Sequence, residues 1–223
     1  MITIEKPIVI MFSSFKLTDA EREALNAIST RIHRPAKRRV YTQGEPGNHI
    51  YRIRSGAVRL EHHMKDGRNQ IFAFLWADDM FGTLEDGLYH TSAITLVDTY
   101  LFQISCSALK GLVEVYPRIQ ALFLQQALDY AKTAERHLLL ATCPLVIKRL
   151  AGFLLECTRQ KDFFDRQSNI LTLAMDRKDI ADYLGFAIET TSRTLKELED
   201  MGLIQRLSSQ RIKIDRDRIG AFV

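Results

Sequence analysis

The sequence DRKDIADYLG at residues 176–185, followed by ETTSRTLK at residues 189–196, decides the fold of the C-terminal part of the chain. Asp176 is a typical helix N-cap residue, and Asp179 adds a second carboxylate to the first turn of the predicted helix. Gly185 then ends this helix and permits a sharp turn. A second helix is predicted from the start of the second stretch. The segment therefore indicates two short helices joined by a turn.

The second predicted helix has a polar face opposite a buried face formed by Leu195 and Leu198. In a helix-turn-helix, the second helix presents its N-terminal residues to base edges in the major groove of DNA. Arg193 can donate two hydrogen bonds to guanine, Glu189 can accept one from cytosine, and Ser192 can do either. We therefore predict that these three residues contact bases. The alternative is that Glu189 and Arg193, four residues apart, form an exposed ion pair on an ordinary surface helix.

Side chains around this motif are candidates for contacts with the DNA backbone. After Gly202, two short apolar stretches around the polar sequence SSQ predict a hairpin, which follows several short helices. Contacts with phosphate position a protein on DNA without reading its sequence. For each side chain taken singly, an ordinary solvated position is the alternative, and Arg206 is a further candidate of this kind. The predicted contacts other than base contacts are Arg177, Lys178, Thr190, Thr191, Lys196, Gln210 and Arg211.

Residues 31–107 have a different pattern, in which short apolar runs are separated by glycines. Residues 58–61 alternate between apolar and polar, residues 70–75 form an apolar run, and Asp66 with Gly67 between them is a strong hairpin signal. Turn residues at this spacing predict an all-β barrel or sandwich.

A long helix is predicted from Pro117 to about Ala141, because neither glycine nor proline interrupts the chain until Pro144. Apolar residues recur along it in steps of three and four, which can form a coiled-coil seam between two copies of the chain. The alternative is a helix packed on its own domain, and Glu135 near the seam weakens the dimer interpretation. The predicted seam consists of Leu124, Leu128, Ala131 and Leu138.

Composition and charge exclude several classes of protein. The chain has 223 residues and a formal net charge of +4, which is compatible with nucleic-acid binding without deciding it. No apolar run approaches the roughly 18 residues of a membrane span, and residues 1–11 lack the layout of a signal peptide. We therefore expect a cytoplasmic protein with no membrane partner. No nucleophile paired with a base and no phosphate-binding glycine loop points to an enzyme.

The chain has three cysteines, Cys106, Cys143 and Cys157, which lie far apart. Their spacing fits neither a disulfide framework nor a zinc site, so no metal site is predicted. We expect reduced structural thiols, with Cys157 on the apolar face of its helix. The alternative is that one of the three acts as a redox switch.

These motifs resemble the CRP/FNR superfamily of bacterial transcription regulators. The resemblance covers nearly the whole chain and is most specific in its C-terminal part. It rests on DIADYLG at residues 179–185, ETTSR at 189–193, GEPG at 44–47, YRIRSG at 51–56, DGR at 66–68 and DMFG at 79–82.

The resemblance implies an α+β fold in three parts: a β-roll of the cyclic-nucleotide-binding type in residues 1–116, a dimerisation helix in residues 117–141 and a winged helix-turn-helix in residues 142–223. It also implies a homodimer on a palindromic site in double-stranded DNA. The pattern Glu-x-x-Ser-Arg that begins at Glu189 is like the FixK and FNR branch, which reads TTGA-type half-sites. We expect an activator with RNA polymerase as a partner.

Two departures from the family pattern concern the ligand. Cyclic-nucleotide members have a ribose-binding glutamate and a phosphate-binding arginine where this chain has Thr83 and Thr91. A buried phosphodiester without its cation is poorly compensated, so we expect no cAMP binding. No cysteine precedes Cys106, so no iron–sulfur cluster is expected, and no cofactor is predicted. The alternative is a sensor of haem, nitric oxide or another small ligand, with haem ligands drawn from His33, His49, His62, His63, His90 and His137.

Overall fold

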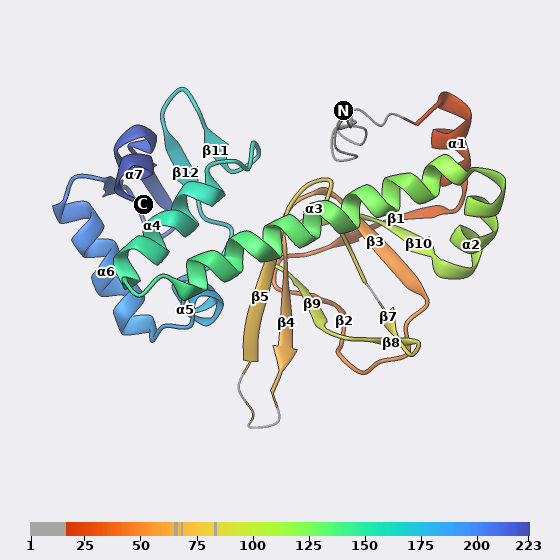
Figure 1. Cartoon of the computed structure of the whole chain (residues 1–223), viewed down its shortest axis with the longest axis horizontal. Coiled ribbons are helices and arrows are strands. Elements are labelled where there is room, and N and C mark those ends of the chain that lie inside the picture. Colours follow the sequence, from red (N-terminus) through yellow and green to blue (C-terminus); the bar gives the residue numbers. More distant parts are fainter. Residues whose placement is uncertain (1–16, 65–66, 68, 83) are drawn as a thin grey trace, which may run out of the picture.

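One long helix, α3 (Pro117–Thr142), connects the two parts of the molecule (Figure 1). The computed structural model describes residues 17–64, 67, 69–82 and 84–223. A part rich in β-strands packs along one half of α3, and short helices with a small sheet gather at its C-terminal end (Figure 1). The α+β class is confirmed, and the long helix ends one residue later than predicted.

Two antiparallel four-stranded sheets form the N-terminal part, which we call the β-roll. One sheet has the strand order β1-β10-β3-β6 and the other β2-β9-β4-β5, while β7 pairs with β8. The strands are β1 (Ser29–Arg34), β2 (Arg39–Tyr41), β3 (His49–Ser55), β4 (Val58–His63), β5 (Asn69–Leu75), β6 (Met80–Phe81), β7 (Leu84–Glu85), β8 (Leu88–Tyr89), β9 (Ser92–Thr95) and β10 (Thr99–Ser105).

The predicted hairpin of the β-roll is present as β4 and β5. Val58 and Leu60 alternate with polar residues and point into the core, as the period-two pattern predicts. The pairing is antiparallel out to His63 opposite Asn69 and contains an irregularity between Leu60 and Glu61. Asp66, on which the turn prediction rested, lies outside the described residues.

Two helices pack beside the N-terminal end of α3: α1 (Asp19–Ala27) and α2 (Cys106–Val115). Ile104, Leu109 and Ile119 form a small buried cluster between these helices, α3 and the end of β10. This cluster fixes the start of α3 on the β-roll.

The C-terminal part is a helical unit with a four-stranded sheet of order β11-β12-β14-β13. The predicted hairpin is confirmed as β13 and β14, but the prediction of only two strands was incomplete. Two more short strands, β11 and β12, are held by pairing rather than by their own propensity, because β12 pairs with β14 and β11 pairs with β12. A final helix was also not predicted. The elements are α4 (Val146–Cys157), β11 (Phe164–Asp165), β12 (Ile170–Thr172), α5 (Arg177–Leu184), α6 (Ile188–Asp200), β13 (Ile204–Arg206), β14 (Arg211–Ile214) and α7 (Arg216–Phe222).

One apolar cluster spans the two parts of the molecule. Ile71 and Phe74 of β5 belong to the same buried cluster as Leu150 and Leu154 of α4 and Ile180 of α5. The outer face of β5 is therefore covered by the C-terminal part. This packing places the helix-turn-helix directly against the β-roll.

Candidate nucleic-acid interface

The first helix of the predicted motif, α5, begins and ends as its sequence predicts. The backbone N–H of Asp179 donates to the Asp176 carboxylate at 2.9 Å, and the N–H of Asp176 donates back to Asp179 at 3.2 Å. This capping box satisfies two N–H groups that the helix start leaves free. Gly185 closes the helix with φ +72°, a left-handed conformation that favours glycine. The predicted turn is therefore confirmed.

The second helix, α6, begins one residue before the predicted start. Its buried side is formed by Thr194, Leu195 and Leu198. Glu189 and Arg193 are exposed on the other side. Within the described part of the chain these two side chains form no ion pair with each other, although they lie four residues apart.

Ser192 and Thr190 are half-buried on α6, and Lys196 is exposed. The predicted base-contacting residues therefore share one accessible side of the helix. Their carboxylate, hydroxyl and guanidinium groups offer both donors and acceptors there.

The prediction for Thr191 is wrong. It was predicted to face DNA, but it is fully buried and its hydroxyl donates to the carbonyl of Ala187 at 3.4 Å. Thr191 precedes Leu195 by four residues and Leu198 by seven, so all three lie on one helix face. That spacing was visible in the sequence and predicts a buried threonine.

The side chains that could contact the DNA backbone differ in exposure and in whether they are already paired within the protein. Gln210 and Arg211 are exposed at the tip of the β13–β14 hairpin, and Arg177 is half-buried at the start of α5. The Lys178 amine bonds the Asp182 carboxylate at 2.7 Å, which raises the pKa of the lysine. Lys178 is therefore a weaker candidate than Arg211, because its charge is already paired.

Arg206, also proposed for this role, is held inside the motif. Its Nε donates to Glu199 of α6 at 2.7 Å, and its backbone N–H donates to the same carboxylate at 2.7 Å. These hydrogen bonds lower the pKa of Glu199. Arg206 thus fastens the hairpin to α6 and is not available to phosphate.

Two further contacts that sequence reasoning missed hold the motif together. The Arg149 guanidinium of α4 lies 4.8 Å above the ring of Phe186, in the turn between α5 and α6. It also donates to the carbonyl of Leu184 at 3.2 Å, at the end of α5. Arg149 therefore supports the turn that sets the angle of α6.

The long helix α3 has two different faces. Phe123 packs on the cluster beside α1 and α2, and His137 stacks on Tyr183 of α5 with ring centroids 4.1 Å apart. The predicted seam lies on the other face, where Leu124 and Leu138 are 51% and 63% exposed. Leu128 and Ala131 are also exposed.

Family models place both parts of the chain. Residues 148–221 match the Crp-like helix-turn-helix domain, and residues 31–116 match the cyclic nucleotide-binding domain. The chain belongs to the CRP/FNR family of transcription regulators. It is therefore a regulator with a helix-turn-helix DNA-binding domain and not an enzyme.

The relatives of this regulator include FixK-type proteins. It is 34% identical over 180 residues to the nitrogen fixation regulation protein FixK of Azorhizobium caulinodans, covering 80% of this chain and 72% of that protein. It is 36% identical over 179 residues to FixK of Rhizobium meliloti, covering 79% of each. The structure of FixK2 from Bradyrhizobium japonicum matches with a TM-score of 0.75 and 31% identity, over 87% of this chain and 96% of that one.

The interior of the β-roll in this regulator is filled with aromatic rings. Tyr41 and Tyr89 stack with ring centroids 3.8 Å apart, and Tyr51 and Phe81 stack at 5.3 Å. All four side chains are buried: Tyr41 comes from one four-stranded sheet, Tyr51 and Phe81 come from the other, and Tyr89 comes from β8. Burial raises the pKa of the Tyr41 and Tyr89 phenols. The interior is therefore a packed core.

No helix among the described residues is both long enough and apolar enough to span a membrane.

Proposed function

We propose that this protein is a homodimeric transcription activator that reads a palindromic TTGA-type site without cAMP or an iron–sulfur cluster. The observation that carries the proposal is the accessible side of α6. Glu189 and Arg193 are exposed there beside half-buried Ser192, and neither charged side chain is held by an ion pair in the described residues. Side chains with free donors and acceptors at the start of the second helix suit base recognition.

Homodimer formation is supported by α3. Its inward face is already covered by its own chain, so the exposed row that includes Leu124, Leu128 and Leu138 needs another partner. These positions recur in steps of three and four, which matches the seam of a two-stranded coiled coil. Two copies joined along this row would present two α6 helices to half-sites about one helical turn of DNA apart.

The interior of the β-roll supports a regulator that does not bind cAMP. Stacked Tyr41 and Tyr89 fill the interior of the β-roll with aromatic rings. Thr91, which replaces the phosphate-binding arginine in the resemblance, is buried and supplies no cation. The residues present therefore do not fit a cyclic nucleotide. Thr83, the other replaced position, lies outside the described residues.

The number and positions of the cysteines support a regulator without an iron–sulfur cluster. No cysteine precedes Cys106, and a cluster of the FNR type needs four cysteine thiolates. The transcriptional activator protein anr of Pseudomonas aeruginosa among the relatives supports an activator. The proposal also includes RNA polymerase as a partner and the cytoplasm as the location.

Fluorescence anisotropy tests the proposal. The purified protein, with no ligand added, is titrated into a TTGA-palindrome duplex and into a scrambled duplex at two salt concentrations. Tight binding to the palindrome alone is the expected result. Weak binding that is equal on both duplexes and falls steeply with salt would mean contact with phosphates only and would contradict the proposal.

A second candidate function is a ligand-responsive regulator of the same fold. A cavity of about 370 Å³ lies between β5, α3, α4 and α5. His137 lines it, and the buried Nδ1 of this residue lacks a hydrogen-bond partner in the described residues. Burial also lowers the pKa of His137, which favours the neutral ring, the form that can bind an uncharged group or a haem iron. A Soret band after addition of haem, lost in His137→Ala, would favour this candidate.

A further inference from the structure

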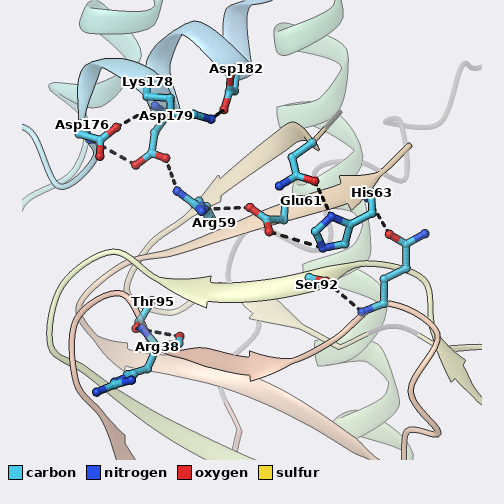
Figure 2. Close-up of polar contacts among 12 residues, drawn as sticks. Arg38, Arg59, Glu61, His63, Ser92, Thr95, Asp176, Lys178, Asp179 and Asp182 are labelled. Atoms are coloured by element: carbon cyan, nitrogen blue, oxygen red, sulfur yellow. Dashed lines mark hydrogen bonds and ion pairs between the residues drawn. The ribbon is translucent and has the colours of Figure 1, made fainter. Parts of the chain in front are cut away.

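An arginine of the β-roll reaches into the helix-turn-helix. Arg59 lies on β4, and its guanidinium bonds the carboxylate of Asp179 on α5 (Figure 2). Its Nε lies 3.1 Å from the carboxylate of Glu61, two residues along the same strand. Glu61 and Asp179 are almost completely buried, with side-chain exposures of 4% and 6%, and Arg59 is 26% exposed. One cation thus bridges two buried carboxylates from the two parts of the molecule.

Asp179 is also the residue that builds the start of α5. One of its carboxylate oxygens accepts the backbone N–H of Asp176 in the capping box, and the other accepts from Arg59. Burial raises the pKa of Asp179, and the Arg59 charge opposes that shift. Without Arg59, the ionised carboxylate would be buried with no cation beside it. The arginine is therefore tied to the start of α5, the helix that precedes α6 in the motif.

The surrounding contacts explain why this bridge can set an orientation. Phe74 of β5 packs against Tyr183 of α5 with ring centroids 4.9 Å apart, so the interface is mainly apolar. Apolar packing is non-directional and does not by itself select one angle between two surfaces. The Arg59 bridge and the bond from Gln70 Nε2 to the carbonyl of Asp182, at 2.6 Å, are directional. They lie at two separate points of α5.

We propose that Arg59 is a positioning residue for DNA recognition: it holds the helix-turn-helix at one angle to the β-roll, so that the two α6 helices of a dimer match one half-site spacing. This inference rests on the proposed function. It explains how a regulator with a packed β-roll interior keeps its DNA-binding part aligned without a ligand. The tertiary contact does the alignment that a bound effector would otherwise provide.

The test compares Arg59→Met with a matched control, Lys37→Met. Both variants remove one positive charge from an ion pair between the β-roll and α5. The control pair, Lys37 with Asp176, is exposed, with its nitrogen and oxygen 3.7 Å apart. Exposed pairs contribute little, so the control should bind DNA as the unmodified protein does.

Each protein is titrated by anisotropy against TTGA palindromes of three kinds: the optimal spacing, one base pair shorter and one base pair longer. Arg59→Met should lose about tenfold in affinity for the optimal duplex, within the usual range of coupling between two sites. It should also discriminate less between the three spacings, because the angle of α6 is no longer fixed. Circular dichroism and size-exclusion chromatography establish that each variant is folded and in the same oligomeric state.

Each outcome decides the question. Arg59→Met with unchanged affinity and unchanged spacing preference overturns the inference while leaving the proposed function intact. If neither the unmodified protein nor any variant binds a palindrome selectively at any spacing, the proposed function is overturned, and the inference with it. If Arg59→Met does not fold, Asp179→Asn decides, because asparagine can still accept the capping hydrogen bond. Its spacing preference should flatten in the same way, and an unchanged preference would reduce Arg59 to a role in folding.

Discussion

The β-roll and the helix-turn-helix belong to the same family fold, but they keep different features of it. In the helix-turn-helix, the residues that suit base recognition are present and accessible, as Glu189 and Arg193 show. In the β-roll, the strand framework is present, while stacked Tyr41 and Tyr89 occupy its interior. The comparison teaches that one chain can keep an accessible polar surface in one part and a closed aromatic core in the other.

Truncating the aromatic core should have the largest effect on this comparison. Tyr41→Ala should lower the free energy of unfolding by about 3–5 kcal/mol, the usual cost of removing a buried aromatic ring. Denaturant unfolding measures this loss. Tyr100→Ala is the matched control, because Tyr100 is 51% exposed on the same β-roll. Equal small losses in both variants would show that the interior is not a packed core.

Removing the guanidinium of α6 should act on binding and not on folding. Arg193→Ala should cost about 1–3 kcal/mol of binding free energy and relax specificity at one guanine. Unfolding should be unchanged, because the side chain is exposed. Anisotropy with single-base variants of the palindrome measures the effect.

Lys196→Ala, on the same helix, is the control for Arg193→Ala and should weaken binding equally on every sequence. If Arg193→Ala behaves in that same uniform way, Arg193 contacts phosphate instead of a base.

Asp79 should make the stability of the β-roll depend on pH. Burial raises the pKa of this carboxyl to about 6. The folded state therefore holds the proton more tightly than the unfolded state, and the resulting stability is lost as the pH rises from about 4 through about 6. The loss should be on the order of 1 kcal/mol, because the side chain is only partly buried.

Urea unfolding at several pH values measures the Asp79 effect. Asp79→Asn should flatten the profile over this interval, and an unaltered slope in the variant would assign the dependence to other groups.

The smallest effect is expected at Cys157. This thiol is completely buried on α4, and burial raises its pKa, so the reactive thiolate is suppressed. In the native protein a thiol reagent should label Cys106 and Cys143, which are half-buried, before Cys157. Rapid labelling of Cys157 without unfolding would reopen the redox-switch alternative.

The sequence predicted the helix-turn-helix closely because its signals are local. Asp176 and Asp179 form the capping box, and Gly185 adopts the left-handed turn, each within a few residues of chain. Thr191 shows where a residue-type argument failed, because its polar hydroxyl hid a position on the buried face of α6. The strand β12 was missed because its partner strand β14 lies about 40 residues further along the chain, and β11 was missed with it because β11 pairs with β12.

By itself, the sequence determined the family, the order of the parts, the ends of the long helix and the accessible side of α6. The family follows from the resemblance of its motifs, whereas the ends of the long helix and the accessible side of α6 follow from periodicity, capping and turn residues, which act over one or two helical turns. Only the tertiary structure decided that Tyr41 and Tyr89 fill the β-roll and that Arg59 meets Asp179, 120 residues away. Such contacts depend on how whole sheets and helices pack, because burial and charge compensation are properties of the assembled interior.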